Sequence, residues 1–159
     1  MQTIHVATDL PTSADRVWSA IKHPASFTYV TRGLVGIPAL AGRTDPIREG
    51  ERGSAWLLAG HVLPVWRHTI DVVRVDEETM TLRTREHGGV IRVWNHALHV
   101  EPRGPRQCRY SDTVEIDAGR LTAAVAALAV RFYRHRQRRW HRLTRLHLLP
   151  AGPRWATPR

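Results

Sequence analysis

His96 and Asp112 are the two side chains whose types and positions could support acid–base chemistry. They fall in two apolar-alternating segments, 90–101 and 106–117, which predict adjacent strands. The short connection over residues 102–105 makes these strands antiparallel, in a register that places His96 opposite Asp112. A carboxylate beside an imidazole fixes its tautomer and raises its basicity, which suits a general acid–base pair. The pair could instead hydrogen-bond a ligand, or only satisfy each other inside the protein.

Strand periodicity decides which side chains accompany that pair. Successive residues of a strand point to opposite faces, so the even-numbered residues of each segment share one face. We expect this face to be the concave one that meets a helix. It carries Val90, Arg92, Trp94, His96, Leu98 and Val100 from the first segment, and Cys108, Tyr110, Asp112, Val114 and Ile116 from the second. The same register places Leu98 opposite Tyr110, whereas a one-residue slip would turn one set outward.

The helix that should meet this face runs from about residue 119 to residue 148. No residue between these limits breaks a helix, and Pro150 ends it. The face predicted to lie against the sheet carries Leu121, Val125, Leu128 and Phe132. Arginines crowd the second half of the helix, so we expect it to begin buried and to end exposed. Residues 149–159 are predicted to form a flexible tail.

The rest of the chain supplies the other elements of a single domain, residues 1–148. Residues 2–8 predict a strand, and two short helices follow, the second starting at Pro24. Further strands are predicted at 34–40, 53–60, 66–75 and 79–86. Strands with helices at both ends are typical of the α+β class. We therefore predict a curved antiparallel sheet of six or seven strands wrapped around the long C-terminal helix.

Composition narrows the functional classes. The 159 residues contain one cysteine, Cys108, which excludes an internal disulfide and a CxxC metal site. No apolar run approaches the roughly 20 residues of a membrane span, and the first residues lack the blocks of a signal peptide, so we expect a cytoplasmic location. His96 and His99 point to opposite faces of a strand, and no HExxH, phosphate-binding or dinucleotide-binding motif occurs. We expect no metal and no cofactor.

The charge of +10 is concentrated in the last part of the chain. All acidic residues lie at or before Asp117, and ten arginines follow it. Helical spacing places Arg134, Arg138, Arg142 and Arg145 in one stripe, which could contact a nucleic acid or an anionic membrane. A single lysine in the whole chain points instead to a compositional bias and a solvated face. We predict weak, salt-sensitive binding of nucleic acid without sequence preference at most.

Four segments resemble the START-like or SRPBCC superfamily, whose helix-grip fold is also called birch-pollen-allergen-like. They read ATDLPTSADRVWSAIKHPASF, REHGGVIRVWNHALHVEP, RYSDTVEI and FYRHRQRRWHRL. The similarity extends over residues 1–148 and is greatest to polyketide cyclase and dehydrase-type ligand-binding proteins. The chain departs from the family pattern at Val90 and Ile91, where relatives often have Pro-Phe, and at Val100, where they often have an aromatic residue.

The resemblance implies a cavity between the sheet and the C-terminal helix that binds a small hydrophobic molecule, such as a lipid, a polyketide or an aromatic compound. The residues expected to line it are Trp66, Trp94, His96, Leu98, Tyr110, Asp112, Leu128 and Phe132. Two alternatives stay open. One is a cofactor-free cyclase or dehydratase that uses His96 and Asp112, and the other is binding of nucleic acid or anionic membrane through the arginines. No feature of the sequence specifies an oligomeric state.

Overall fold

The computed structural model describes residues 1–159 except residues 41, 61, 148 and 150–159. Seven strands form one antiparallel sheet in the order β1-β7-β6-β5-β4-β3-β2. The strands are β1 (Gln2–Leu10), β2 (Val35–Gly36), β3 (Arg52–Ala59), β4 (Leu63–Asp76), β5 (Thr81–Gly88), β6 (Ile91–Gly104) and β7 (Gln107–Asp117). The helices are α1 (Ala14–Ile21), α2 (Pro24–Thr31) and α3 (Thr122–Arg145), with short 3-10 turns η1 (Pro38–Leu40) and η2 (Gly119–Leu121).

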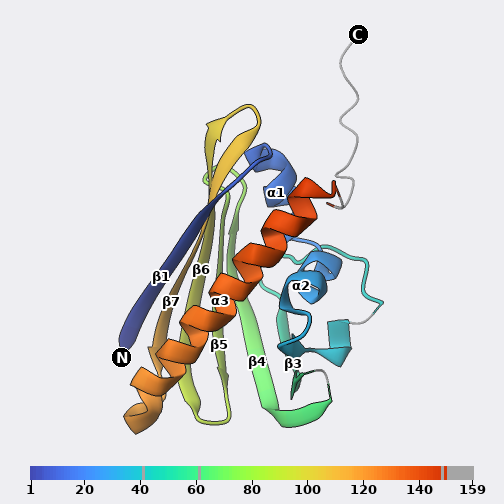
Figure 1. The fold of residues 1–159 in the computed structure, drawn as a ribbon. Helices are drawn as coiled ribbons and strands as arrows, with labels where there is room; N and C mark the ends of the chain where they lie inside the picture. Colours follow the sequence, from blue (N-terminus) through green and yellow to red (C-terminus); the bar gives the residue numbers. More distant parts are fainter. Residues whose placement is uncertain (41, 61, 148, 150–159) are drawn as a thin grey trace.

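The arrangement confirms the predicted α+β helix-grip fold. Figure 1 shows α3, in orange and red, crossing the curved sheet diagonally, with α1 and α2 beside its C-terminal half. The contacts of α3 are mainly with β1 and α2, so α3 covers the part of the sheet formed by β1 and β7. Of the predicted tail, only Leu149 belongs to the described residues. None of the described helices is long and apolar enough to span a membrane.

The predicted strand 34–40 was wrong beyond its first residues. Only Val35–Gly36 pairs with β3, and the chain then turns through η1. Pro38 begins that turn, and proline has no N–H to donate to a strand ladder. The other predicted strands are confirmed, with ends that differ by a few residues.

The predicted buried face of α3 was wrong for two of its four residues. Leu121 and Leu128 are exposed, whereas Val125 and Phe132 are partly buried and pack against the core. The residues of α3 that are buried are Ala126, Ala129, Tyr133, Arg136, Gln137, Trp140, Leu143 and Thr144. Burial also continues to the end of α3, so the expectation that it begins buried and ends exposed was wrong. The alanines explain the phase, because small side chains let the helix backbone approach β1 closely, and leucines at those positions would hold it away.

The alternation predicted for the last two strands is confirmed for β7 and for most of β6. The even-numbered residues of β7 from Cys108 to Ile116 are all buried. At the start of β6, however, Ile91 is buried while Val90 and Arg92 are exposed. The irregular pairing between Glu86 and Gly88 shifts the side-chain alternation there.

The predicted register of the β6–β7 hairpin was wrong by two residues. His96 pairs with Val114, and the residue opposite Asp112 is Leu98, not His96, while Tyr110 pairs with Val100. The hairpin closes later than expected, with Gly104 paired to Gln107 and a bulge between Pro102 and Gly104. A shift by two residues keeps each side chain on its face, which is why the burial pattern was still predicted correctly.

The core consists of two apolar clusters. The first surrounds Leu10, Val17 and Trp140, and the second surrounds Ile4, Val114 and Tyr133. Polar side chains that are buried or nearly buried on β4, β5, β6, β7 and the middle of α3 belong to neither cluster, and we call this set the polar layer. Its members are His68, Thr84, Glu86, His96, Asp112, Arg136 and Gln137.

Candidate functional site

Asp112 is the centre of the polar layer. Its side chain is fully buried, and its Oδ1 lies 2.9 Å from His96 Nε2 and 2.9 Å from the Tyr110 hydroxyl. Gln137 Nε2 lies 3.4 Å from Oδ2 and also donates to the backbone carbonyl of Val6 at 2.8 Å. Three side chains from three elements therefore converge on one carboxylate.

The Asp112 carboxylate is held in its charged form. Desolvation by burial raises its pKa, but the positive charge of Arg136 and the hydrogen bonds from His96 and Tyr110 outweigh this and lower the pKa below 3.8. An ionised carboxylate only accepts hydrogen bonds, so His96 Nε2 carries the proton that it donates. His96 Nδ1 is then the nitrogen with a free lone pair, which could accept a proton or a hydrogen bond.

Arg136 brings a positive charge into the layer from α3. Its side chain is 5% exposed, Nη2 donates to the Tyr110 hydroxyl at 3.3 Å, and Nη1 lies 3.9 Å from Asp112 Oδ1. The guanidinium also lies over three aromatic rings, at 5.0 Å from the centroid of Tyr133, 5.8 Å from Phe132 and 5.9 Å from Phe27. Arg136 Nε is buried and has no hydrogen-bond partner among the described residues.

A second histidine–carboxylate pair lies on the neighbouring strands. His68 Nε2 on β4 is 3.0 Å from Glu86 Oε2 on β5, and the Thr84 hydroxyl donates to Glu86 Oε1 at 2.5 Å. Burial raises the pKa of Glu86, but the hydrogen bond from His68 and the charge of His96 lower it overall. Two carboxylates, Asp112 and Glu86, and one guanidinium, that of Arg136, therefore lie in the polar layer.

Trp66 supports this second pair. Its indole Nε1 donates to His68 Nδ1 at 3.3 Å. The indole ring lies against the turn after β5, where a Cβ on Gly89 would stand 2.6 Å from the ring. A side chain at Gly89 would therefore displace Trp66 from His68.

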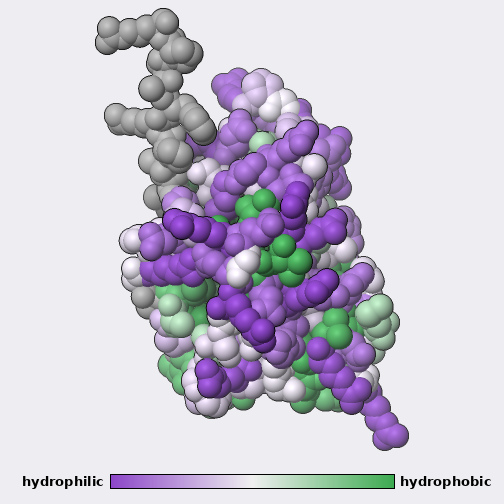
Figure 2. Space-filling view, turned by 180° about the vertical axis from the view of Figure 1, so that it is seen from behind, coloured by the Kyte–Doolittle hydropathy of each residue, from purple (hydrophilic) through white to green (hydrophobic). Residues whose placement is uncertain are grey.

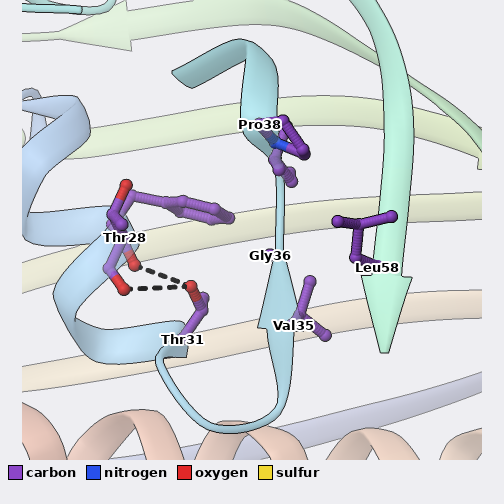
Figure 3. Close-up of a pocket in the computed structure, with 8 residues that line it drawn as sticks. Thr28, Thr31, Val35, Gly36, Pro38 and Leu58 are labelled. Carbon is purple, nitrogen blue, oxygen red and sulfur yellow. Dashed lines mark hydrogen bonds between the residues drawn. The ribbon is translucent and has the colours of Figure 1, made fainter. Parts of the chain in front are cut away.

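Figure 3 shows a pocket between α2 and the β2–β3 edge of the sheet. Its volume is about 150 Å³, and its lining is Phe27, Thr28, Thr31, Val35, Gly36, Ile37, Pro38 and Leu58. The Thr31 hydroxyl turns back to donate to the Phe27 carbonyl at 3.0 Å, so the walls are mainly apolar. A second pocket of about 440 Å³ adjoins α1, but charged residues line it, and two of them, Lys22 and Glu77, pair at 2.7 Å.

Phe27 connects the first pocket to the polar layer. It lines the pocket, and its ring lies 5.9 Å from the Arg136 guanidinium. One aromatic side chain thus separates a small apolar pocket from a buried cation.

The structure brings together only some of the side chains expected to line a cavity. His96, Asp112 and Tyr110 form one hydrogen-bonded group, and Trp94 Nε1 lies 3.3 Å from the hydroxyl of Tyr133 beside them. Leu98 is buried in the first apolar cluster, Phe132 packs against the second, and Leu128 is 63% exposed. None of the eight residues, Trp66 included, lines either of the two pockets described above.

Sequence reasoning missed His68, Arg136, Gln137 and Tyr133. His68 lies two residues after Trp66, so strand alternation already placed both on one face. Arg136 follows Phe132 by four residues on α3, which is one helical turn, but an arginine in a basic cluster gives no sign of burial. Among the described residues, no group of three or more histidines, cysteines or acidic residues could hold a metal ion.

Known structures with the same fold extend the comparison. Norcoclaurine synthase from Thalictrum flavum, in complex with dopamine and hydroxybenzaldehyde, has a TM-score of 0.66 at 16% identity, covering 92% of this chain and 87% of its own. The Zhui aromatase/cyclase from Streptomyces sp. R1128 has a TM-score of 0.67 at 13% identity, covering 95% and 98%. A START superfamily protein from Mycobacterium smegmatis has a TM-score of 0.65 at 13% identity, covering 91% and 98%.

These similarities show a START-like helix-grip fold. A family model described as Domain of unknown function (DUF8410) matches residues 8–144, which is more than half of the chain. A comparison with curated proteins finds no match.

Proposed function

The chain belongs to the family described as Domain of unknown function (DUF8410), and we propose from its geometry that it binds a small, mainly apolar molecule. The observation that carries this proposal is the apolar pocket that Phe27 lines. A volume of about 150 Å³ is the size of an apolar cavity that accommodates one benzene-sized ring. A lipid chain, a polyketide or an aromatic compound could place such a group there.

The polar layer supplies a polar partner for the same ligand. Arg136 lies behind Phe27 with an unpartnered Nε, and rotation of the Phe27 ring would bring a bound molecule toward that guanidinium. A ligand with an apolar ring and one oxygen atom could then place the ring against the apolar walls of the pocket and accept a hydrogen bond from the guanidinium with its oxygen. Two proteins with this fold are a norcoclaurine synthase in complex with dopamine and hydroxybenzaldehyde and an aromatase/cyclase, which supports the proposal by analogy.

The pocket can be tested by filling it. Leu58→Trp places an indole in the pocket, and Leu63→Trp is the matched control, because Leu63 is 64% exposed and outside the pocket lining. We expect native mass spectrometry to detect a retained small molecule on the wild type and on Leu63→Trp, but not on Leu58→Trp. Titration with hydroxybenzaldehyde, followed by methyl NMR of Val35 and Leu58, supplies a second readout. Equal retention by both variants, or no binding to the wild type, would contradict the proposal.

Acid–base catalysis is a second candidate function, favoured by the hydrogen bond between His96 and Asp112. In this role His96 Nδ1 would accept a proton from the ligand, and Asp112 would stabilise the resulting imidazolium. The variants His96→Gln and Asp112→Asn should then abolish cyclisation or dehydration of a polyketide thioester. His99→Gln is the control, because His99 is exposed on the same strand. Turnover that survives in His96→Gln would exclude this mechanism.

A further inference from the structure

Three chain connections lie at one end of the sheet, where β3, β5 and β7 finish (Figure 1). They are the β3–β4 turn, the β5–β6 turn and the β7–α3 connection, and we call them together the three-turn end. Each displays an aliphatic side chain. Val62 in the first is 81% exposed, and Leu63, the first residue of β4, is 64% exposed. Val90 is 48% exposed in the second connection, and Leu121 is 51% exposed in the third.

Neighbouring elements enlarge this apolar end. Leu128 follows Leu121 by two helical turns and is also exposed. Leu34 is partly exposed, and its carbonyl accepts a hydrogen bond from Gly60 in the β3–β4 turn at 2.9 Å. In the view from behind, Figure 2 shows a largely hydrophilic surface with hydrophobic patches in its middle and along its lower margin. Several exposed aliphatic groups at one end of a molecule indicate an interaction surface.

Basic side chains surround the three-turn end. Arg120 lies in the β7–α3 connection itself, and the Arg92 guanidinium lies 3.4 Å from where a Cβ on Gly119 would stand. The backbone carbonyl of Arg67 lies next to Gly88, at the end of β5. All three arginines are exposed, and none forms an ion pair with the described residues. The acidic residue Asp117 accepts a hydrogen bond from the Gly119 backbone at 2.8 Å.

We propose that the three-turn end docks on an anionic lipid surface. Aliphatic side chains at turn tips can enter the boundary between headgroups and acyl chains, while arginines beside them pair with lipid phosphates. The tips are separate, because turns two strands apart lie about 10 Å from each other along the sheet, and separate tips suit a deformable bilayer better than a flat protein face. A symmetric pairing with a second copy would place these arginines against one another.

This proposal goes beyond ligand binding in the pocket. Val35 and Leu58 line the pocket and lie within two residues of Leu34 and Gly60. The lipid surface would therefore lie near the pocket. The two proposals can fail separately, since Leu58→Trp tests the pocket and the experiment below changes only exposed residues.

The test is sedimentation of the 159-residue chain with vesicles of phosphatidylcholine alone or with about one-third phosphatidylserine. Val62→Ser/Leu63→Ser is compared with Val73→Ser/Leu146→Ser, a control pair of exposed valine and leucine outside the three-turn end. Arg92→Gln/Arg120→Gln is compared with Arg138→Gln/Arg142→Gln on the exposed face of α3.

We expect the wild type to bind only the anionic vesicles. Loss of the two aliphatic tips should weaken binding about tenfold or more. Loss of the two arginines should weaken it about tenfold or more as well, because each basic residue near such a surface contributes about a factor of five. Both control pairs should bind like the wild type.

Three results would overturn the proposal. One is absence of vesicle binding by the wild type. Another is loss of binding only in Arg138→Gln/Arg142→Gln, which would assign the surface to α3. The third is concentration-dependent self-association that disappears in Val62→Ser/Leu63→Ser, measured by analytical ultracentrifugation, which would show that a second copy covers the three-turn end.

Discussion

His96 Nε2 lies 2.9 Å from Asp112 Oδ1, although the two residues are diagonal neighbours and not partners in the β6–β7 ladder. Diagonal residues on one face of a sheet are still within reach of a long side chain. The offset places Leu98 beside Asp112 on the ladder and leaves the carboxylate open to Tyr110 and Arg136.

Removing the charge of Asp112 should destabilise the protein strongly. Asp112→Asn leaves the Arg136 guanidinium buried without its nearest carboxylate, and breaking a buried pair in this way costs about 3–5 kcal/mol. Asp9→Asn removes an exposed carboxylate, 3.5 Å from Arg109, and should cost at most about 1 kcal/mol. Urea unfolding of both variants measures the difference, and equal losses would show that Asp112 does not compensate Arg136.

The free energy of unfolding should fall in acid. The pKa values of Asp112 and Glu86 are lowered in the folded protein from 3.8 and 4.5. Groups of this kind stabilise the fold fully above their unfolded pKa, and the contribution is lost as the pH falls through the folded pKa. Urea unfolding from about pH 7 to pH 3 should show the decline beginning near pH 4.5. Glu86→Gln should flatten part of this decline, and an unchanged slope would rule out its contribution.

Gly89→Ala should be more destabilising than Gly60→Ala. Both glycines have a positive φ, 55° and 58°, so alanine is strained by about 1 kcal/mol at either position. Only at Gly89 would the new Cβ also meet the Trp66 ring, because nothing lies within 4 Å at Gly60. Overpacking of this kind adds about 1–3 kcal/mol. Thermal or urea unfolding gives both values, and similar losses would mean that Trp66 moves without cost.

The arginine stripe of α3 should bind polyanions only weakly. Arg134, Arg138, Arg142 and Arg145 are exposed as predicted, whereas Arg139 lies over the ring of Tyr29, 4.3 Å from its centroid. We expect fluorescence anisotropy with random RNA and DNA to show weak binding at low salt that disappears near about 150 mM salt, where exposed charges are screened. Sub-micromolar affinity at that salt concentration would favour a nucleic-acid function over ligand binding.

Local residue patterns were enough to predict the class of fold and the buried face of β7. Strand alternation placed Cys108, Tyr110 and Asp112 on the buried face of β7, and this prediction is confirmed. The order of strand and helix patterns gave the helix-grip arrangement. These properties depend on local periodicity, which each segment carries in its own residues.

The strand register, the buried face of α3 and the composition of the polar layer depend on contacts between distant elements. Burial of Arg136 in place of Leu128 follows from the close approach that Ala126 and Ala129 allow against β1. His68 on β4 pairs with Glu86 on β5, and Arg136 on α3 pairs with Asp112 on β7. Such choices depend on how distant elements fill space and compensate buried charge together, and no single segment encodes that balance.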